Sequence, residues 1–219
     1  MQNPLVSIES ILKRIYDLPH THQARHFLVQ RPAHLPSANS EQDGAVWVCE
    51  DDLGLQIGLY FSQATLSSLQ AFPFWERSRW THEQNKAFSV IAEELSHFHF
   101  LIHHLPLGRS VSHLELEFQG EIDKFLLSFA AKVDGTKSDS KLFDEVYQQI
   151  FEHFSLRPHL SDLERERYDQ ANRLAKNFIK AHLRMPLIQE SITSLLPNLR
   201  RYYRLSFTEK VSMIASRRL

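Results

Sequence analysis

The sequence predicts a mainly α-helical bundle with one β-hairpin in its N-terminal third. Residues 81–105 and 112–133 carry apolar side chains at helical spacing, and the short loop PLGRSV between them makes these two helices a central antiparallel pair. Residues 45–61 read instead as two strands around a polar turn. Periodic segments after residue 140 add further helices, so about five to eight helices are expected in total.

Length and composition are those of an ordinary soluble domain. The 219 residues are expected to form a single domain, with an N-terminal part over residues 1–80 and a helical bundle over residues 81–219. Hydrophobic residues make up 42% and charged residues 23% of the chain, and the net charge is -1. This balance argues against a general attraction to nucleic acid or to acidic membranes.

Compartment and redox setting follow from what the sequence does not contain. No apolar run reaches the roughly 18 residues of a membrane span, and the N-terminus lacks the pattern of a signal peptide. A cytoplasmic protein that makes no membrane contact is therefore expected. The single cysteine, Cys49, excludes an internal disulfide and a cysteine-rich metal site.

The N-terminal part is expected to begin with a helix over residues 4–18. Asn3 is suited to cap this helix, and Pro4 stands at its first position. Residues 20–30 are expected to form a short helix or an irregular segment. Residues 31–44 are rich in Pro, Ser, Asn and Asp and are expected to form a loop.

The hairpin is formed by the segments AVWVCE and LQIGLYF, which flank a turn at residues 51–54. Because two strands alone are marginally stable, the hairpin is expected to pack on the helices. Ser62 then begins a short helix that ends at Leu69. Four aromatic residues before the central pair are more typical of a core than of a ligand platform: Phe72, Phe74, Trp75 and Trp80.

The first central helix carries an acidic residue on the arc that should face the core. At about 100° per residue, Glu94 falls inside the apolar stripe and His97 at its edge. The same periodicity predicts that Glu93, His99 and His103 face solvent.

The second central helix begins with the capping pair Ser112 and Glu115 and has a matching pattern. Glu121 falls within its apolar arc and Glu117 at the margin of that arc. The far side of the helix is expected to carry the next polar residues and a glycine: Gly120, Asp123 and Lys124.

The two acidic stripes are expected to meet. Glu94 lies eleven residues before the end of its helix and Glu121 nine residues after the cap of the next, so at about 1.5 Å per residue they lie at similar depth. His97 and Glu117 are matched in the same way, nearer the loop. Glu94, His97, Glu117 and Glu121 therefore converge between the helices in this prediction.

Buried carboxylates need a partner, which is either a metal or another protein group. Glu94-x-x-His97 with a glutamate on the next helix resembles half of a ferritin-like carboxylate site, for which iron, manganese or zinc are candidate metals. The chain contains no second Glu-x-x-His, which argues against a complete di-iron site. The alternative is that Glu94 and Glu121 pair with Arg, Lys, Tyr or His from other helices.

The C-terminal half is expected to supply such polar partners. A helix over residues 141–154 follows a linker, and Ser161 begins another helix that ends near residue 182, with Tyr168 and Asn172 on its inward arc. Short helices are expected over residues 188–196 and 208–216. Five arginines make the C-terminus basic: Arg200, Arg201, Arg204, Arg217 and Arg218. Arg204 is also a candidate to neutralise the buried carboxylates.

Four segments resemble an uncharacterised family of bacterial cytoplasmic proteins. These segments are EELSHF (93–98), LELEFQGEIDKF (114–125), ERERYDQAN (164–172) and RRYYRLSFTEK (200–210). The resemblance extends over most of the chain from the hairpin onward. It implies a bacterial, cytoplasmic setting and no particular activity.

Two classes of function follow from these patterns. In the favoured class, the protein is a non-catalytic binding or regulatory protein that acts through contacts with an unidentified protein partner and needs no cofactor. In the other class, it is a carboxylate–histidine metalloprotein, and an oxidase is among its candidate activities. Its metal ligands would be Glu94, His97 and Glu121. Glu117 would be a fourth ligand or a group behind the ligands, and Tyr168 a nearby hydrogen-bond donor. Binding of nucleic acid is the least favoured function, and a homodimer remains open.

Overall fold

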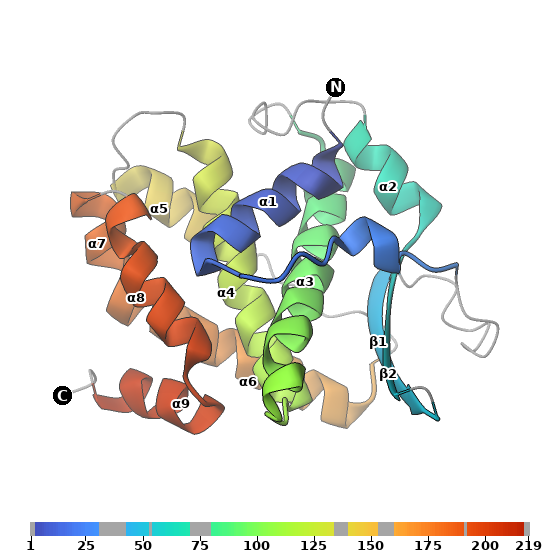
Figure 1. Cartoon of the computed structure of the whole chain (residues 1–219). Helices are drawn as coiled ribbons and strands as arrows, with labels where there is room; N and C mark the ends of the chain where they lie inside the picture. The colour runs from blue at the N-terminus through green and yellow to red at the C-terminus, as the bar shows by residue number, and fades with distance from the viewer. Residues whose placement is uncertain are drawn as a thin grey trace.

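The computed structural model describes residues 3–30, 43–52, 54–70, 80–133, 140–152, 160–190 and 192–216, and these residues form a helical bundle with one hairpin. The long helices α3 (His82–His104) and α4 (His113–Lys132) run antiparallel through its centre (Figure 1). Thr81 caps α3 in a reciprocal pair with Gln84, and the Ser112 side chain accepts from the backbone N–H of Glu115 at the start of α4. The predicted central pair is therefore confirmed.

The N-terminal helix α1 (Pro4–Tyr16) lies across both central helices (Figure 1). Asn3 caps it as expected, and Asp17 ends it in the left-handed conformation. The irregular segment that follows contains one 3₁₀ turn, Ala24–Phe27. The predicted loop over residues 31–44 and three members of the aromatic group, Phe72, Phe74 and Trp75, lie almost wholly outside the described residues.

The hairpin pairs β1 (Gly44–Asp51) with β2 (Gly54–Phe61) in an antiparallel register that joins Gly44 to Phe61. It packs on α3, as a two-stranded ribbon must in order to be stable. Helix α2 (Gln63–Gln70) then follows Ser62 and also lies against α3. The expected hairpin and the short helix after it are both confirmed.

The remaining helices all follow α4 in the chain. They are α5 (Ser140–Tyr147), α6 (Asp162–Phe178), α7 (Arg184–Gln189), α8 (Ile192–Arg204) and α9 (Phe207–Ser216). A π-helical turn follows α5 at Gln148–Glu152, and another follows α6 at Ile179–Leu183. Helix α6 runs beside α4 and begins at the predicted capping pair of Ser161 and Glu164.

The prediction for residues 188–196 is wrong, because α8 continues through Pro197 to Arg204. A proline inside a helix removes one backbone hydrogen bond and is therefore usually a stop signal. Here four side chains of α8 are buried on one face, which stabilises the helix beyond the proline: Leu195, Leu199, Tyr202 and Tyr203. Tertiary packing, which local sequence signals do not indicate, thus extends the helix.

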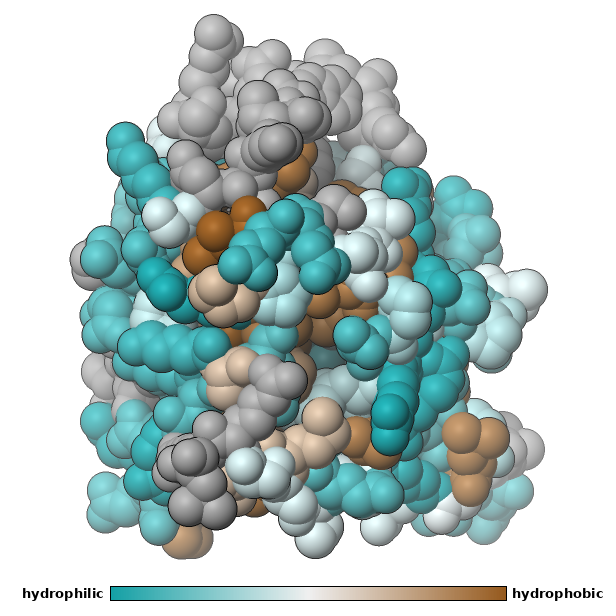
Figure 2. Space-filling model, turned by 90° about the vertical axis from the view of Figure 1, so that its left-hand side faces the viewer, coloured by the Kyte–Doolittle hydropathy of each residue, from teal (hydrophilic) through white to brown (hydrophobic). Residues whose placement is uncertain are grey.

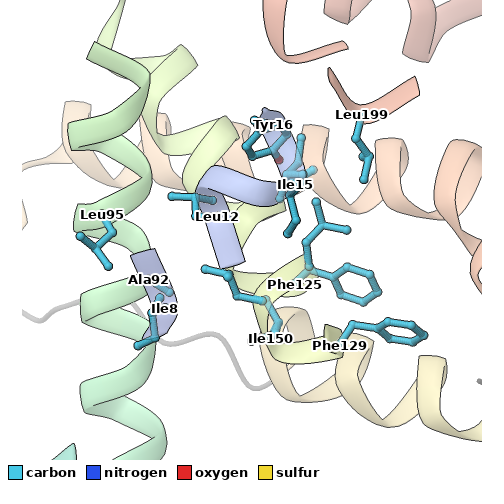
Figure 3. Close-up of a cluster of buried hydrophobic side chains, with 14 of the residues drawn as sticks. Ile8, Leu12, Ile15, Tyr16, Ala92, Leu95, Phe125, Phe129, Ile150 and Leu199 are labelled. Atoms are coloured by element: carbon cyan, nitrogen blue, oxygen red, sulfur yellow. The ribbon is translucent and has the colours of Figure 1, made fainter. Parts of the chain in front are cut away.

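The core is formed where α1, α3, α4 and α8 meet. Figure 3 shows this cluster, whose labelled members are Ile8, Leu12, Ile15, Tyr16, Ala92, Leu95, Phe125, Phe129, Ile150 and Leu199. Both central helices are covered on several sides at once, so that polar residues on them are buried together with apolar ones.

The face of the molecule on the side of α5, α7, α8 and α9 is mostly hydrophilic, with smaller hydrophobic areas between hydrophilic residues (Figure 2). Within the described ranges, no helix has the length and apolar character that crossing a membrane requires.

Candidate metal centre

The acidic residues of α3 and α4 do meet, with His97 at the middle of the group. Its Nε2 atom lies 3.7 Å from Oε2 of Glu117 on α4, and its Nδ1 atom lies 3.6 Å from Oε2 of Glu94 one turn earlier on α3. All three residues are buried. The imidazole is thus held between a carboxylate on its own helix and one on the neighbouring helix.

The three residues whose ligand atoms come closest to a possible metal site, among the described residues, are Glu93, His97 and Glu117. One ligand atom from each lies within 4.8 Å of the others. Ligand atoms around a tetrahedral zinc ion are about 3.4 Å apart, so the side chains would need to move inward by about 1 Å. The expectation that Glu93 faces solvent is wrong, since its carboxylate turns toward Lys124 and His97.

Lys124 places a cation inside this group. Its Nζ atom donates to Oε2 of Glu93 at 2.9 Å and to Oε1 of Glu121 at 2.8 Å. Lys124 was expected on the far side of α4 but is buried. Glu121 therefore pairs with a lysine on its own helix, and its second oxygen, Oε2, is buried without a hydrogen-bond partner among the described residues.

Helix α6 contributes Arg167, whose Nε atom lies 3.8 Å from Oε1 of Glu117. Asn172 is buried as predicted, and its Nδ2 atom has no hydrogen-bond partner in the described part of the chain. Tyr168 is half-buried, and the Arg167 guanidinium lies over its ring. The predicted partnership of Tyr168 and Asn172 with Glu94 or Glu121 stays a prediction.

The predicted role of Arg204 is wrong. Arg204 is exposed and donates to the backbone carbonyls of Arg200 and Asp17, at 2.8 Å and 3.3 Å. It therefore donates hydrogen bonds to backbone carbonyls at the ends of α8 and α1, and not to the carboxylates between α3 and α4.

The pKa values at the centre follow from burial and from mutual charge. Burial alone lowers the pKa of His97, but the carboxylates of Glu94, Glu117 and Glu93 outweigh it and raise that pKa to about 9. Burial raises the pKa of Glu117 to about 7 and also raises the pKa of Glu121, against the effect of Lys124. At neutral pH the imidazole is therefore protonated, and a metal would have to replace its proton.

A second polar network lies deeper between the same helices, around Asp123. This carboxylate accepts from Ser96 Oγ at 2.5 Å, from Gln119 Nε2 at 3.1 Å and from the hydroxyl of Tyr16 on α1. Asp123 was expected on the far side of α4 but is completely buried. Burial raises its pKa to about 6, and the three hydrogen bonds oppose this rise.

Lys210 of α9 extends this network to the C-terminal helix. Its side chain is 0% exposed, with Nζ 3.3 Å from Gln119 Oε1 and 3.5 Å from Glu115 Oε1. The same atom lies 4.5 Å from the ring centre of Phe100. Burial lowers the pKa of Lys210 to about 8. The protein therefore holds an ammonium group in a largely aromatic surrounding.

A third group joins α1 to α3 on the side away from the acidic trio. His99, expected to face solvent, is completely buried, with Nε2 3.2 Å from Glu9 Oε1 and Nδ1 3.3 Å from Nε2 of His20. Glu9 also accepts from the backbone N–H of Ala24 at 2.9 Å. These ligand atoms do not form a close trio like that of Glu93, His97 and Glu117.

One signal in the sequence does indicate the buried polar residues that the apolar stripes alone do not predict. The segment FHFLIHH places Phe98, Phe100 and Leu101 on different sides of α3, and Phe125, Leu126 and Leu127 do the same on α4. A helix that is apolar all round is buried all round. His99, Asp123 and Lys124 are therefore buried because their helices have no solvent face at that depth.

Comparisons of the chain with models of known protein families, with curated proteins and with solved structures found no match.

Proposed function

We propose that this protein binds a divalent metal ion between α3 and α4, through Glu93, His97 and Glu117. The observation that supports this function most strongly is the state of His97. Its Nε2 atom is buried, has no hydrogen-bond partner among the described residues and lies 3.7 Å from Glu117, and His97 offers one of three ligand atoms that lie within 4.8 Å of one another. A buried ring nitrogen that faces a carboxylate beyond hydrogen-bond distance is a candidate to bind a metal between them.

The remaining contacts of the centre fit this proposal. Glu94 lies behind His97 on the Nδ1 side, where metal-binding histidines commonly donate to a carboxylate that fixes the ring. One imidazole and two carboxylates suit zinc, manganese or iron. The ligands belong to one ion rather than to a di-iron pair, so the earlier set of Glu94, His97 and Glu121 changes to Glu93, His97 and Glu117.

The test is elemental analysis of the full chain, purified without a histidine tag or chelator and then reconstituted with each metal in turn. We expect close to one zinc, manganese or iron per chain, and loss of that metal in His97→Ala and in Glu117→Gln. The matched control is His113→Ala, since His113 is exposed at the start of α4 and should not affect the metal. A chain that stays metal-free after reconstitution, or a His97→Ala variant that keeps its metal, would refute the proposal.

One observation favours the second candidate, a non-catalytic cytoplasmic protein that acts by contact with a protein partner. Lys124 and Arg167 already place two cations against the carboxylates, so the acidic centre can be structural. Under that function Glu121→Ala leaves Lys124 with one carboxylate fewer and lowers the free energy of unfolding by about 3–5 kcal/mol, with no metal involved. Metal analysis of the wild-type protein separates the two candidates.

A further inference from the structure

A pocket of about 330 Å³ lies between two helical segments on the side of the bundle opposite the hairpin. One segment is α5 with the π-helical turn that follows it, and the other is the π-helical turn after α6 together with α7. Helices α5 and α7 lie side by side at the left of Figure 1, and the hairpin lies at its right. A volume of this size suits a small molecule, and none of the described residues that line the pocket belongs to the proposed metal centre.

Both π-helical turns of the described ranges contribute side chains to this pocket. Gln148 and Glu152 are the first and last residues of one turn, and Lys180 belongs to the other. Turns of this kind are rare in proteins and occur frequently at functional sites. Two of them facing the same pocket are an indication of binding that is independent of the pocket's volume.

The two walls of the pocket carry opposite charges. The segment that begins with α5 supplies Asp144, Gln148 and Glu152, and the segment that ends with α7 supplies Lys180 and Arg184. The residues of each wall follow one another at intervals of four, so their side chains are neighbours along the helix. One wall therefore offers two carboxylates, and the other offers an ammonium and a guanidinium.

The charged groups of the two walls do not satisfy one another. The Nη2 atom of Arg184 lies 3.6 Å from Oδ1 of Asp144, which is longer than a hydrogen bond. Glu152 pairs instead with Lys176, whose Nζ atom lies 3.4 Å from its Oε1 atom. Lys180 forms no ion pair with any described residue, and its Nζ atom lies 4.7 Å from the ring centre of Tyr147. Donors on one wall and acceptors on the other therefore remain available to a ligand.

Two buried aromatic rings form the floor of the pocket. They are those of Phe143 and Tyr147 in α5. The guanidinium of Arg184 lies over the Phe143 ring, 5.8 Å from its centre, as the ammonium of Lys180 lies over the Tyr147 ring. These cation–π contacts hold both cationic groups at the pocket, so that less conformational freedom is lost when a ligand binds them.

We propose that this pocket binds a small zwitterion, a free amino acid. The carboxylate of the ligand lies against Lys180 and Arg184, and its ammonium lies against Asp144 and Glu152. An anion without an ammonium would meet two unfavourable carboxylates, and a cation without a carboxylate would meet two unfavourable cations. A ligand that carries both charges is complementary to both walls.

The experiment is a titration of the full, isotope-labelled chain with each of the common amino acids in turn, followed by NMR. We expect at least one amino acid to shift the amide signals of residues 143–152 and 179–184 in a saturable way. The N-acetyl derivative and the methyl ester of that amino acid each lack one of the two charges. Both should bind about tenfold more weakly or worse, because each loses its hydrogen bonds to charged groups.

Two substitutions test the walls separately. Lys180→Met removes the cation that faces the ligand carboxylate, and Asp144→Asn removes a charge that faces the ligand ammonium. Each should weaken binding of the amino acid by about tenfold, and both change exposed side chains, so the fold should be kept. The matched controls are Lys141→Met and Glu145→Gln, on exposed residues of α5 that do not line the pocket, and both should bind as wild type does.

Three results would overturn this proposal. They are the absence of saturable shifts at the pocket with every amino acid, an N-acetyl derivative or a methyl ester that binds as tightly as the free amino acid, and a control variant that weakens binding as much as Lys180→Met does. His97→Ala removes the proposed metal ligand far from this pocket and should bind the amino acid as wild type does. The test is therefore independent of the metal centre.

Discussion

Gly120 on α4 lies directly against the imidazole of His97 on α3. A Cβ atom at position 120 would be 3.0 Å from Nε2 of His97, the atom that faces Glu117. The absence of a side chain at one residue of α4 therefore sets how closely the ring of the other helix can approach. A methyl group added at position 120 is therefore expected to change metal affinity and protein stability in opposite directions.

Gly120→Ala is expected to weaken metal binding without lowering stability. The methyl group must push the His97 ring by a few tenths of an ångström, which disturbs the ligand trio, whereas alanine in a helix interior is more favourable than glycine by about 1 kcal/mol. Chelator competition should show a loss of affinity of about tenfold, and urea unfolding of the metal-free protein should show equal or higher stability. An unchanged metal affinity would contradict the assignment of Nε2 as the ligand atom.

Lys124 is expected to compete with the metal for Glu93. Its Nζ atom lies 2.9 Å from Oε2 of Glu93 and 2.8 Å from Oε1 of Glu121. Lys124→Met therefore removes a positive charge that lies beside the proposed ligand Glu93. Metal affinity should rise on the order of tenfold or more, because two cations close together repel each other in a partly buried site. Titration with Zn²⁺ against a chelator measures this change.

The same substitution should destabilise the metal-free protein. Loss of the lysine leaves the buried Glu121 carboxylate without its cation, at a cost of about 3–5 kcal/mol of unfolding free energy. Bound metal should restore much of this stability. Lys141→Met, on an exposed residue of α5, serves as the control. A Lys124→Met protein whose affinity falls would show that the lysine supports the metal site rather than competing with it.

The sequence predicts the elements of this fold well, because helix starts are local events. The side chains of Thr81, Ser112 and Ser161 each accept from the backbone N–H three residues later, and each begins a helix where expected. The co-location of His97 and Glu117 was also predictable, since helix rise and a short loop place them at equal depth. The error in α8 arose from a local stop signal, Pro197, that tertiary packing overrides.

The partners within the centre were not predictable in the same way. A single apolar stripe predicts one buried face for each central helix, whereas α1, the hairpin and α6 cover other faces of these two helices. Glu93, Lys124 and Asp123 therefore make contacts that a single apolar stripe cannot indicate. The choice of the carboxylates that pair with Lys124 depends on side-chain rotamers and on residues distant in the chain. The spacing of residues in the sequence does not contain that information.

Asp123→Asn is expected to change the pH dependence of stability between pH 4 and 6. The folded-state pKa of Asp123 is raised from 3.8 to about 6, so the folded protein binds more protons than the unfolded chain in this range, and wild-type stability falls as the pH rises. The shift corresponds to about 3 kcal/mol. Asparagine keeps an acceptor for Tyr16 or Ser96 but does not titrate.

The measurement is the difference in unfolding free energy between Asp123→Asn and wild type, from urea titrations at several pH values. This difference should move in favour of the variant by up to about 3 kcal/mol between pH 4 and 6 and then stay constant. Other titrating groups cancel in the difference, apart from nearby Lys210, which stays charged in this range. A constant difference across the range would mean that the folded-state pKa of Asp123 is ordinary.

Lys210 is expected to destabilise the protein at neutral pH through the burial of its charge. Its pKa is lowered from 10.5 to about 8, so between these values the unfolded chain binds more protons, and wild-type stability rises with pH. Lys210→Met fills the same space beside Phe100 without a charge, and the carboxylate of Glu115 keeps its contact with Arg109. The variant should therefore be at least as stable as wild type at pH 7.

The test again compares unfolding free energies over a range of pH. The advantage of Lys210→Met should shrink by about 3 kcal/mol as the pH rises from 8 to 10.5, because the wild-type lysine loses its proton and the cost of its charge. The facing groups Glu115, Arg109 and Asp123 are common to both proteins, and Lys141→Met controls for the loss of a lysine elsewhere. The opposite result would be a Lys210→Met protein that is several kcal/mol less stable than wild type at pH 7. It would show that the contacts of the ammonium with Gln119, Glu115 and the Phe100 ring stabilise the packing of α9 on the central pair.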